Sequence, residues 1–206
     1  MTKPRTRIQQ KNHTAIMAAG LEVFSQYGFR GSTLDQVAEA AGLSKPNVLY
    51  YFPSKEAIYT ELLLGLLENW LEPLEQLNAN GDPVEELLDY VHRKLAMSRD
   101  FPRESRLFAT AILQGASEIK PVLEGELRDL VNEKARIILT WIEAGKIRPV
   151  DPAHLIFSIW ALTQHYADFD VQVRAILGPE DPFETAGTYL DDLFRRLLAP
   201  DSTAVG

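Results

Sequence analysis

The chain has 206 residues, of which 46% are hydrophobic, so it can bury a core without cross-links. It has no cysteine, which excludes disulfides and thiolate sites and is typical of a reducing cytoplasm. The net charge is −8. The N-terminus lacks the apolar core of a secretory signal, and no apolar run is long enough to cross a bilayer. We therefore expect a soluble cytoplasmic protein with no membrane partner.

Charge is divided unevenly along the chain. Residues 1–55 hold seven basic and three acidic residues, whereas residues 56–206 hold fourteen basic and twenty-six acidic residues. A basic segment joined to an acidic one can bring a single face of the molecule to a polyanion such as DNA. Chance clustering of solvated surface charges is the alternative explanation.

The first fifty residues predict three helices. Apolar residues recur at three- and four-residue intervals over 8–27, 34–41 and 44–51. Ser32 or Thr33 can cap the second helix, which Gly42 ends. Ser44 can cap the third, with Pro46 in the first turn, where its missing N–H has no helical partner to lose.

The remaining residues also predict helices, separated by clusters of proline, glycine and aspartate. We expect a long amphipathic helix over 54–77 and five more over 84–98, 104–114, 121–144, 152–177 and 183–198. No strand-like alternation is longer than a few residues. The prediction is an all-α fold with a three-helix head (residues 1–53), a larger helical body (residues 54–200) and a disordered tail (residues 201–206).

The second and third helices, joined by a turn at AGLS, predict a helix-turn-helix, which lays the start of its second helix along base edges in the major groove. Val48 is the expected core position. Asn47 can hydrogen-bond a base edge, Pro46 can touch a thymine methyl group, and Tyr50 and Tyr51 can reach phosphates. A packing module of three helices, with both tyrosines partly buried, fits the same periodicity.

Basic residues flank this segment. Lys45 and Lys55 lie on either side of it, and Lys55 opens a helix whose unpaired N–H groups favour a phosphate. Further minor-groove or backbone contacts are expected from a basic N-terminal arm that carries Lys3, Arg5, Arg7 and Lys11.

The run GFRGSTLDQVAEAAGLSKPNVLYYFPSKEAIY, residues 28–59, resembles the DNA-binding head of the tetracycline-repressor family of bacterial transcriptional regulators. It matches the family's Gly-aromatic pair, the threonine before a short helix, Ala-Ala-Gly, Ser-Lys, the aromatic pair with Phe, and Ser-Lys-Glu. The resemblance implies DNA contacts for Thr33, Ser44, Lys45, Pro46, Asn47, Tyr50, Tyr51 and Lys55. Leu49 departs from the pattern, because members usually have tyrosine there.

The same resemblance implies a body that binds a small ligand and forms a homodimer through its last two helices. A dimer also suits DNA recognition, because one helix-turn-helix reads few base pairs and a palindromic operator matches a two-fold axis. The apolar residues of these two helices fit either an interface or an ordinary core: Leu155, Ile159, Leu190, Leu193, Phe194 and Leu197.

Residues 154–173 are the most unusual segment of the body, because polar and aromatic residues interrupt its apolar pattern. Trp160 and Gln164 lie one turn apart, so an indole can stack on a planar heterocycle while a carboxamide hydrogen-bonds its edge. The other candidates for a ligand site are Trp70, Lys94, Ser98, Arg106, Phe108 and His165. Each candidate also fits a structural role in the core or in an ion pair.

Three body segments, ENWLEPL, SRDFPRESRLF and DPAHLIFSIWALTQHYADF, resemble the uracil-responsive repressors of pyrimidine utilisation. The similarity implies uracil or thymine as an effector that releases the protein from its operator, and it implies no cofactor. We expect the ligand to shift the helix over 54–77 and so change the separation of two heads.

Two other classes of function fit parts of the sequence. A metal-dependent or His/Asp-based enzyme could use His154, His165, Asp168 and Asp170, but the chain has four histidines in all and no HExxH, phosphate-binding glycine loop or nucleophile elbow. A helical adaptor for protein partners would show no salt-dependent affinity for duplex DNA. The sequence therefore favours a DNA-binding regulator, acting as a repressor, over an enzyme.

Overall fold

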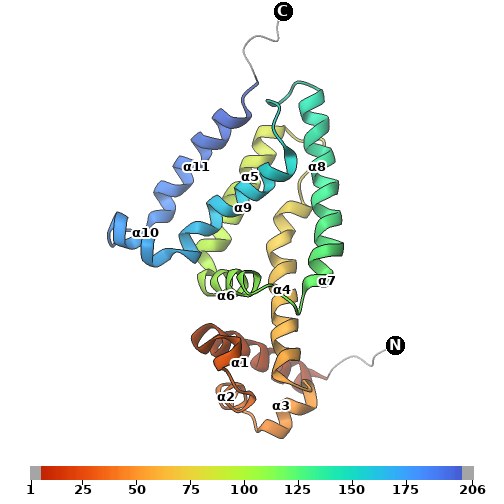
Figure 1. The fold of residues 1–206 in the computed structure, drawn as a ribbon, viewed down its shortest axis with the longest axis vertical. Coiled ribbons are helices and arrows are strands. Elements are labelled where there is room, and N and C mark those ends of the chain that lie inside the picture. Colours follow the sequence, from red (N-terminus) through yellow and green to blue (C-terminus); the bar gives the residue numbers. More distant parts are fainter. Residues whose placement is uncertain (1–5, 201–206) are drawn as a thin grey trace, which may run out of the picture. The chain divides into compact units, whose positions relative to one another are not determined.

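A computed structural model of the chain describes residues 6–200, and these residues form helices and connecting turns with no strand. The expected all-α class is confirmed. The elements, shown in Figure 1, are α1 (Arg7–Gly31), α2 (Leu34–Ala40), α3 (Lys45–Tyr51), α4 (Lys55–Glu75), α5 (Pro83–Asp100), α6 (Pro102–Leu113), α7 (Lys120–Val122), a π-helical segment (Leu123–Leu127), α8 (Arg128–Glu143), α9 (Pro152–Asp168), α10 (Asp170–Leu177) and α11 (Pro182–Leu198). The tail predicted over 201–206 lies outside the described residues.

Side-chain caps fix where most of these helices begin. Thr33 caps α2 in a reciprocal box with Gln36, and Ser44 caps α3 by accepting from the backbone N–H of Asn47. Three Asp-Pro pairs start later helices. The aspartate carboxylate accepts hydrogen bonds from N–H groups of the first turn, and proline has no backbone N–H that would need an acceptor. They are Asp82-Pro83 at α5, Asp151-Pro152 at α9 and Asp181-Pro182 at α11.

Three helices differ from expectation. The first continues beyond a kink at Gly28, whose φ is 68°, and ends at Gly31. The helix expected over 121–144 opens with α7 and the π-helical segment before α8 begins. The single helix predicted over 152–177 is wrong, because Phe169 leaves helical geometry (φ −113°, ψ 28°) and separates α9 from α10.

The chain forms two compact units. The first unit comprises residues 1–68 and 106–120, and the second comprises residues 69–105 and 121–206. Helices α4 and α6 each begin in one unit and continue into the other. The functional boundary between residues 53 and 54 remains a prediction.

The first unit packs α1 to α3 against the start of α4. Val48 is fully buried, as expected for the core position of α3, and Ile16 and Ile58 are equally buried. The ring of Tyr59 lies edge-on to Phe24 at 5.1 Å and stacks on Phe29 at 4.6 Å between centroids. These apolar contacts hold the short helices α2 and α3, which are too short to be stable alone.

In the second unit α5 packs against α9 and α11, and α8 packs against α9 (Figure 1). Their shared core includes Leu88, Val91, Ile138, Ile156 and Phe194, all at most 1% exposed. Burying such side chains removes apolar surface from water and is the main source of stability.

Two buried donors in this second unit bind backbone carbonyl groups at the end of α4 and in the turn that follows it. Lys134 Nζ donates to the Glu75 carbonyl at 2.8 Å, and Trp141 Nε1 donates to the Ala79 carbonyl at 3.1 Å. The Glu75 carbonyl belongs to the last turn of α4, where carbonyl groups have no partner inside the helix.

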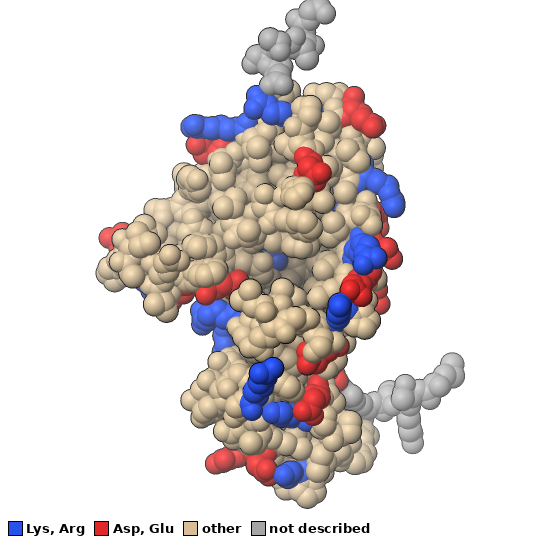
Figure 2. Space-filling model, in the orientation of Figure 1, with Lys and Arg blue, Asp and Glu red and all other residues tan. Residues whose placement is uncertain are grey.

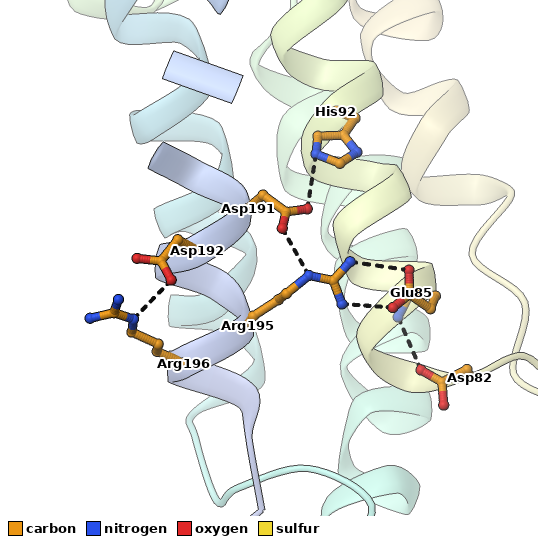
Figure 3. Close-up of polar contacts among 7 residues, drawn as sticks. All are labelled: Asp82, Glu85, His92, Asp191, Asp192, Arg195 and Arg196. Carbon is orange, nitrogen blue, oxygen red and sulfur yellow. Dashed lines mark hydrogen bonds and ion pairs between the residues drawn. The ribbon is translucent and has the colours of Figure 1, made fainter. Parts of the chain in front are cut away.

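A polar network joins the exposed edges of α5 and α11 (Figure 3). The Arg195 guanidinium donates to both Glu85 carboxylate oxygens at 2.7 and 3.4 Å, and its Nε donates to Asp191 at 2.8 Å. Asp191 also lies 3.4 Å from His92 Nε2. The fork geometry fixes the angle between two helices, although each exposed pair adds little stability.

Candidate functional site

Helix α3 is two turns long and buries only Val48. Its cap Ser44 and the next three residues, Lys45, Pro46 and Asn47, are exposed, as are Leu49 at 43% and Tyr50 at 70%. Tyr51 is half-buried, and Thr33 at the start of α2 is exposed. The structure therefore gathers the predicted DNA-contacting residues on and around one helix whose outer side chains are mostly exposed.

The two lysines of that set already have partners. Lys45 Nζ lies 2.9 Å from an Asp35 carboxylate oxygen, in a pair that is exposed and therefore weak. Lys55 Nζ donates to the backbone carbonyls of Phe29 at 2.8 Å and Ser32 at 2.7 Å, and lies 4.6 Å from the centre of the Phe29 ring. Lys55 thus connects the first turn of α4 to the junction between α1 and α2.

The first turns of α1 lie beside the tyrosines. Gln9 Nε2 donates to Tyr50 Oη at 3.1 Å, and Asn12 Nδ2 donates to Tyr51 Oη at 3.2 Å. Sequence reasoning missed both amides, although a capping box over residues 6–9, TRIQ, was a signal that this turn is ordered. Of the basic arm, Arg7 and Lys11 are exposed on α1, and Lys3 and Arg5 lie outside the described residues.

The surface of the first unit is not uniformly basic. On the face drawn in Figure 2, acidic and basic side chains alternate in the region of α1 to α3. Lys45 and Asp35 form one ion pair in this unit.

The candidate ligand site centres on Lys94, a buried cation in the second unit. Lys94 is 2% exposed, and its Nζ lies 4.3 Å from the centre of the Trp70 ring and 3.4 Å from the Trp70 carbonyl oxygen. Among residues 6–200 no carboxylate lies within ion-pairing distance of it. Burial lowers the pKa of Lys94 to about 7, against the opposing influence of Asp168.

Helix α9 contacts α5 at Tyr90, one turn before Lys94. Trp160 Nε1 donates to Tyr90 Oη at 2.5 Å, and burial raises the pKa of Tyr90, which keeps the phenol neutral. Gln164 follows Trp160 by one turn and is half-buried. Sequence reasoning did not identify Tyr90 as a candidate, although it precedes Lys94 by four residues and so lies on the same face of the helix.

The other ligand candidates are placed differently. Ser98 is fully buried, and its hydroxyl donates to the Lys94 carbonyl at 3.1 Å. His165 is on the exposed side of α9, where its ring stacks on Phe169 at 5.0 Å. Arg106 is exposed and Phe108 half-buried, and both belong to the first unit. Trp70, Lys94, Ser98, Trp160 and Gln164 thus share the second unit on three helices.

The residues that an enzyme could use for catalysis are dispersed among other contacts. Asp168 accepts from Ser105, Asp170 pairs with Arg174, and His154 lies edge-on to Phe157. Residues 6–200 contain no cluster of three or more potential metal ligands. Nor does any helix in this range combine the length and the apolar character that a bilayer crossing requires.

Two family models match nearly the whole chain. The model described as "Bacterial regulatory proteins, tetR family" matches residues 16–62, and the model described as "YcdC-like protein, C-terminal region" matches residues 63–201. The first covers α2 and α3 together with most of α1 and the start of α4.

Curated relatives and solved structures extend the likeness. The HTH-type transcriptional regulator RutR from Escherichia coli K12 is 48% identical over 177 residues, 86% of this chain and 84% of that protein. The transcriptional repressor NicS from Pseudomonas putida is 28% identical over 71% of this chain and 69% of its own. The TetR family regulator PfmR from Thermus thermophilus shares the fold with a TM-score of 0.68 at 24% identity, covering 88% of this chain and 97% of its own.

Proposed function

The chain belongs to the tetR family of bacterial regulatory proteins and is a DNA-binding transcriptional regulator rather than an enzyme, and on this premise we propose that it is a cytoplasmic repressor whose homodimer leaves a palindromic operator when a small planar ligand binds. The observation that carries the proposal is α3, which buries Val48 alone and leaves its remaining side chains available to a major groove.

The proposed DNA contacts follow from the chemistry of each group. Asn47 can donate to and accept from a base edge, and the tyrosine hydroxyls can bond to phosphate oxygens. Lys55 uses two of its three N–H donors on carbonyls, so one donor remains for a phosphate. The proposed contacts are Thr33, Ser44, Lys45, Pro46, Asn47, Tyr50, Tyr51 and Lys55.

The proposed effector is uracil or thymine. A pyrimidine-dione offers two carbonyl acceptors and ring N–H donors at the edge of a flat ring. Lys94 can donate to a carbonyl, Gln164 can both donate and accept, and an indole of Trp70 or Trp160 can cover the ring face. A buried ammonium without a carboxylate partner supports this, because a ligand carbonyl would satisfy a donor that the chain leaves poorly satisfied. Ser98, Arg106, Phe108 and His165 remain proposed members of the site.

A homodimer is supported by apolar surface that the chain itself does not cover. Leu155, Ile159, Leu190 and Phe194 are core residues, at most 3% exposed. The uncovered residues lie instead on α9 to α11: Phe157, Phe169, Val171, Ile176, Leu177, Tyr189 and Leu197, each between 38% and 85% exposed.

The proposed coupling runs along α4, which belongs to both compact units. A ligand at Trp70 and Lys94 would bias the position of this helix and so the spacing of two heads on DNA. A coupling free energy of about 1–3 kcal/mol is enough for a useful switch.

The test separates the two sites. Tyr50→Ala is expected to weaken binding to an operator duplex while leaving the thermal shift with uracil or thymine unchanged, and Gln164→Ala is expected to do the reverse. Fluorescence anisotropy with labelled duplex and thermal-shift titration with each base measure the two functions. Equal loss of both functions in either variant would contradict the division into two sites.

A further inference from the structure

The capping box at the start of α1 fixes which way the Gln9 amide faces. Thr6 Oγ1 accepts from the backbone N–H of Gln9 at 3.3 Å, and the Gln9 side-chain oxygen accepts from the backbone N–H of Thr6 at 2.8 Å. Because a backbone N–H can only donate, the amide oxygen has to face Thr6. The amide nitrogen then faces Tyr50 Oη, 3.1 Å away, and donates to it.

This orientation determines where the Tyr50 proton points. The phenol oxygen accepts from Gln9, so its own O–H has to point elsewhere. No group within residues 6–200 accepts a hydrogen bond from Tyr50 Oη, and the residue is 70% exposed. An edge-on contact with the Tyr51 ring, 5.1 Å between centroids, restrains the Tyr50 ring itself. Accepting one hydrogen bond also strengthens a hydroxyl as a donor.

We propose that Gln9 is a positioning residue for DNA binding, which orients the Tyr50 hydroxyl as a donor toward a phosphate oxygen. The inference rests on the proposed DNA contact of Tyr50. Phosphate oxygens can only accept hydrogen bonds, so the direction of the phenol proton decides whether this contact forms. Arg7 and Lys11, exposed on the same turns of α1, supply the charge that brings a phosphate near.

The decisive variant is Gln9→Glu. Glutamate at this position keeps the capping box, because one carboxylate oxygen can still accept from Thr6. The second oxygen can only accept, so the Tyr50 hydroxyl turns inward to donate to it and is lost as a donor to DNA. Gln10→Glu is the matched control, since Gln10 is exposed on the same turn and receives the same added charge without a tyrosine partner.

Both variants are made in the wild-type protein and in Tyr50→Phe, and dissociation constants are measured for a duplex that the wild-type protein selects from a random-sequence library. We expect Gln9→Glu to weaken binding about tenfold more than Gln10→Glu, the value of one charge-assisted hydrogen bond. In the Tyr50→Phe background this excess is expected to vanish. Thermal unfolding should be similar for the two glutamate variants, which a purely structural role of Gln9 would not produce.

The outcomes are distinct. An equal loss in Gln9→Glu and Gln10→Glu, or an excess that persists in Tyr50→Phe, overturns the inference and leaves the proposed function standing. A library from which the wild-type protein enriches no sequence overturns the proposed function, and this inference with it.

Discussion

At the scale of single residues, four lysines show how surroundings decide what one side chain does. Lys45 is exposed beside Asp35, Lys55 donates to two backbone carbonyls, and Lys134 completes the end of α4. Lys94 alone combines near-complete burial with an aromatic face and a weak carbonyl contact. Its ammonium is the costliest of the four to keep charged, because burial removes water from it and no carboxylate among residues 6–200 forms an ion pair with it; Asp168 offsets this cost only in part.

The stability of the protein should therefore depend on pH through Lys94. Its pKa is lowered from 10.5 to about 7 in the folded chain, so between those values the unfolded chain binds a proton that the folded chain lacks. The contribution of Lys94 to the free energy of unfolding then rises with pH, by roughly 1 kcal/mol per unit, whereas below pH 7 the full cost of burial remains. Lys94→Met should be more stable than wild type at pH 6, by a margin that narrows toward pH 10.

Urea denaturation at pH 6, 7, 8 and 9 measures this dependence. Lys146→Met is the control, because it makes the same substitution at an exposed position. A difference between wild type and Lys94→Met that stays constant from pH 6 to 9 would refute the assignment.

Lys55 should contribute to both stability and DNA binding. Lys55→Met leaves the Phe29 and Ser32 carbonyls without their donor, which costs about 1–2 kcal/mol, and it removes one proposed phosphate contact. The slope of log affinity against log salt should then fall by about 0.9. Lys45→Met should lower the slope similarly with little loss of stability, because its pair with Asp35 is exposed. Unchanged thermal stability of Lys55→Met would count against the structural part of this account.

At the scale of elements, the sequence predicts best where local chemistry sets a boundary. The starts of α2 and α3 follow from Thr33 and Ser44, whose hydroxyls accept N–H groups within three residues. The break at Phe169 involves neither proline nor glycine, so composition carries no trace of it. After the break, α10 buries Val173 alone.

The same distinction applies to the candidate sites. The proposed contact residues of α3 lie in one short segment with a specific family pattern, and this is why the sequence can suggest them. The Gln9–Tyr50 and Trp160–Tyr90 contacts join residues 41 and 70 positions apart, and no local periodicity reports them. Pairings across helices depend on the packed core, which a single sequence does not specify residue by residue.

Gly28 and Gly31 offer a matched test of the kink in α1. Gly28 has a φ of 68°, in the left-handed region that a Cβ atom disfavours, and nothing else lies within 4 Å of the Cβ position. Gly31 has no such φ, and an added Cβ would make only ordinary contact with Tyr27. Gly28→Ala should lower the free energy of unfolding by about 1 kcal/mol, whereas Gly31→Ala should leave it unchanged or raise it. Thermal melts compare the two, and equal effects would mean that the kink costs nothing.

At the scale of the whole molecule, residues that are far apart in the sequence can belong to the same compact unit. Residues 106–120 are far along the chain from α1 to α3 and yet belong to the same compact unit. Two helices, α4 and α6, therefore contribute residues to both units.

The proposed dimer involves a second copy of the chain and can be tested by placing a charge on α11. Tyr189 is 58% exposed on α11, one turn from Leu193 and two turns from Leu197, so a charge there would disrupt an apolar interface without disturbing the fold. Tyr189→Glu should halve the molar mass measured by sedimentation equilibrium.

Operator affinity should fall with the mass, by at least about a hundredfold, because one helix-turn-helix reads too few base pairs to bind tightly alone. The thermal shift with uracil or thymine should remain, since Lys94 and Gln164 belong to a single chain. Leu139→Glu, which adds the same charge at an exposed apolar position on α8, should stay dimeric and bind DNA normally. A wild-type protein that sediments as a monomer while bound to its operator would rule out the two-headed mechanism, because spacing between heads could then not be the quantity that the ligand controls.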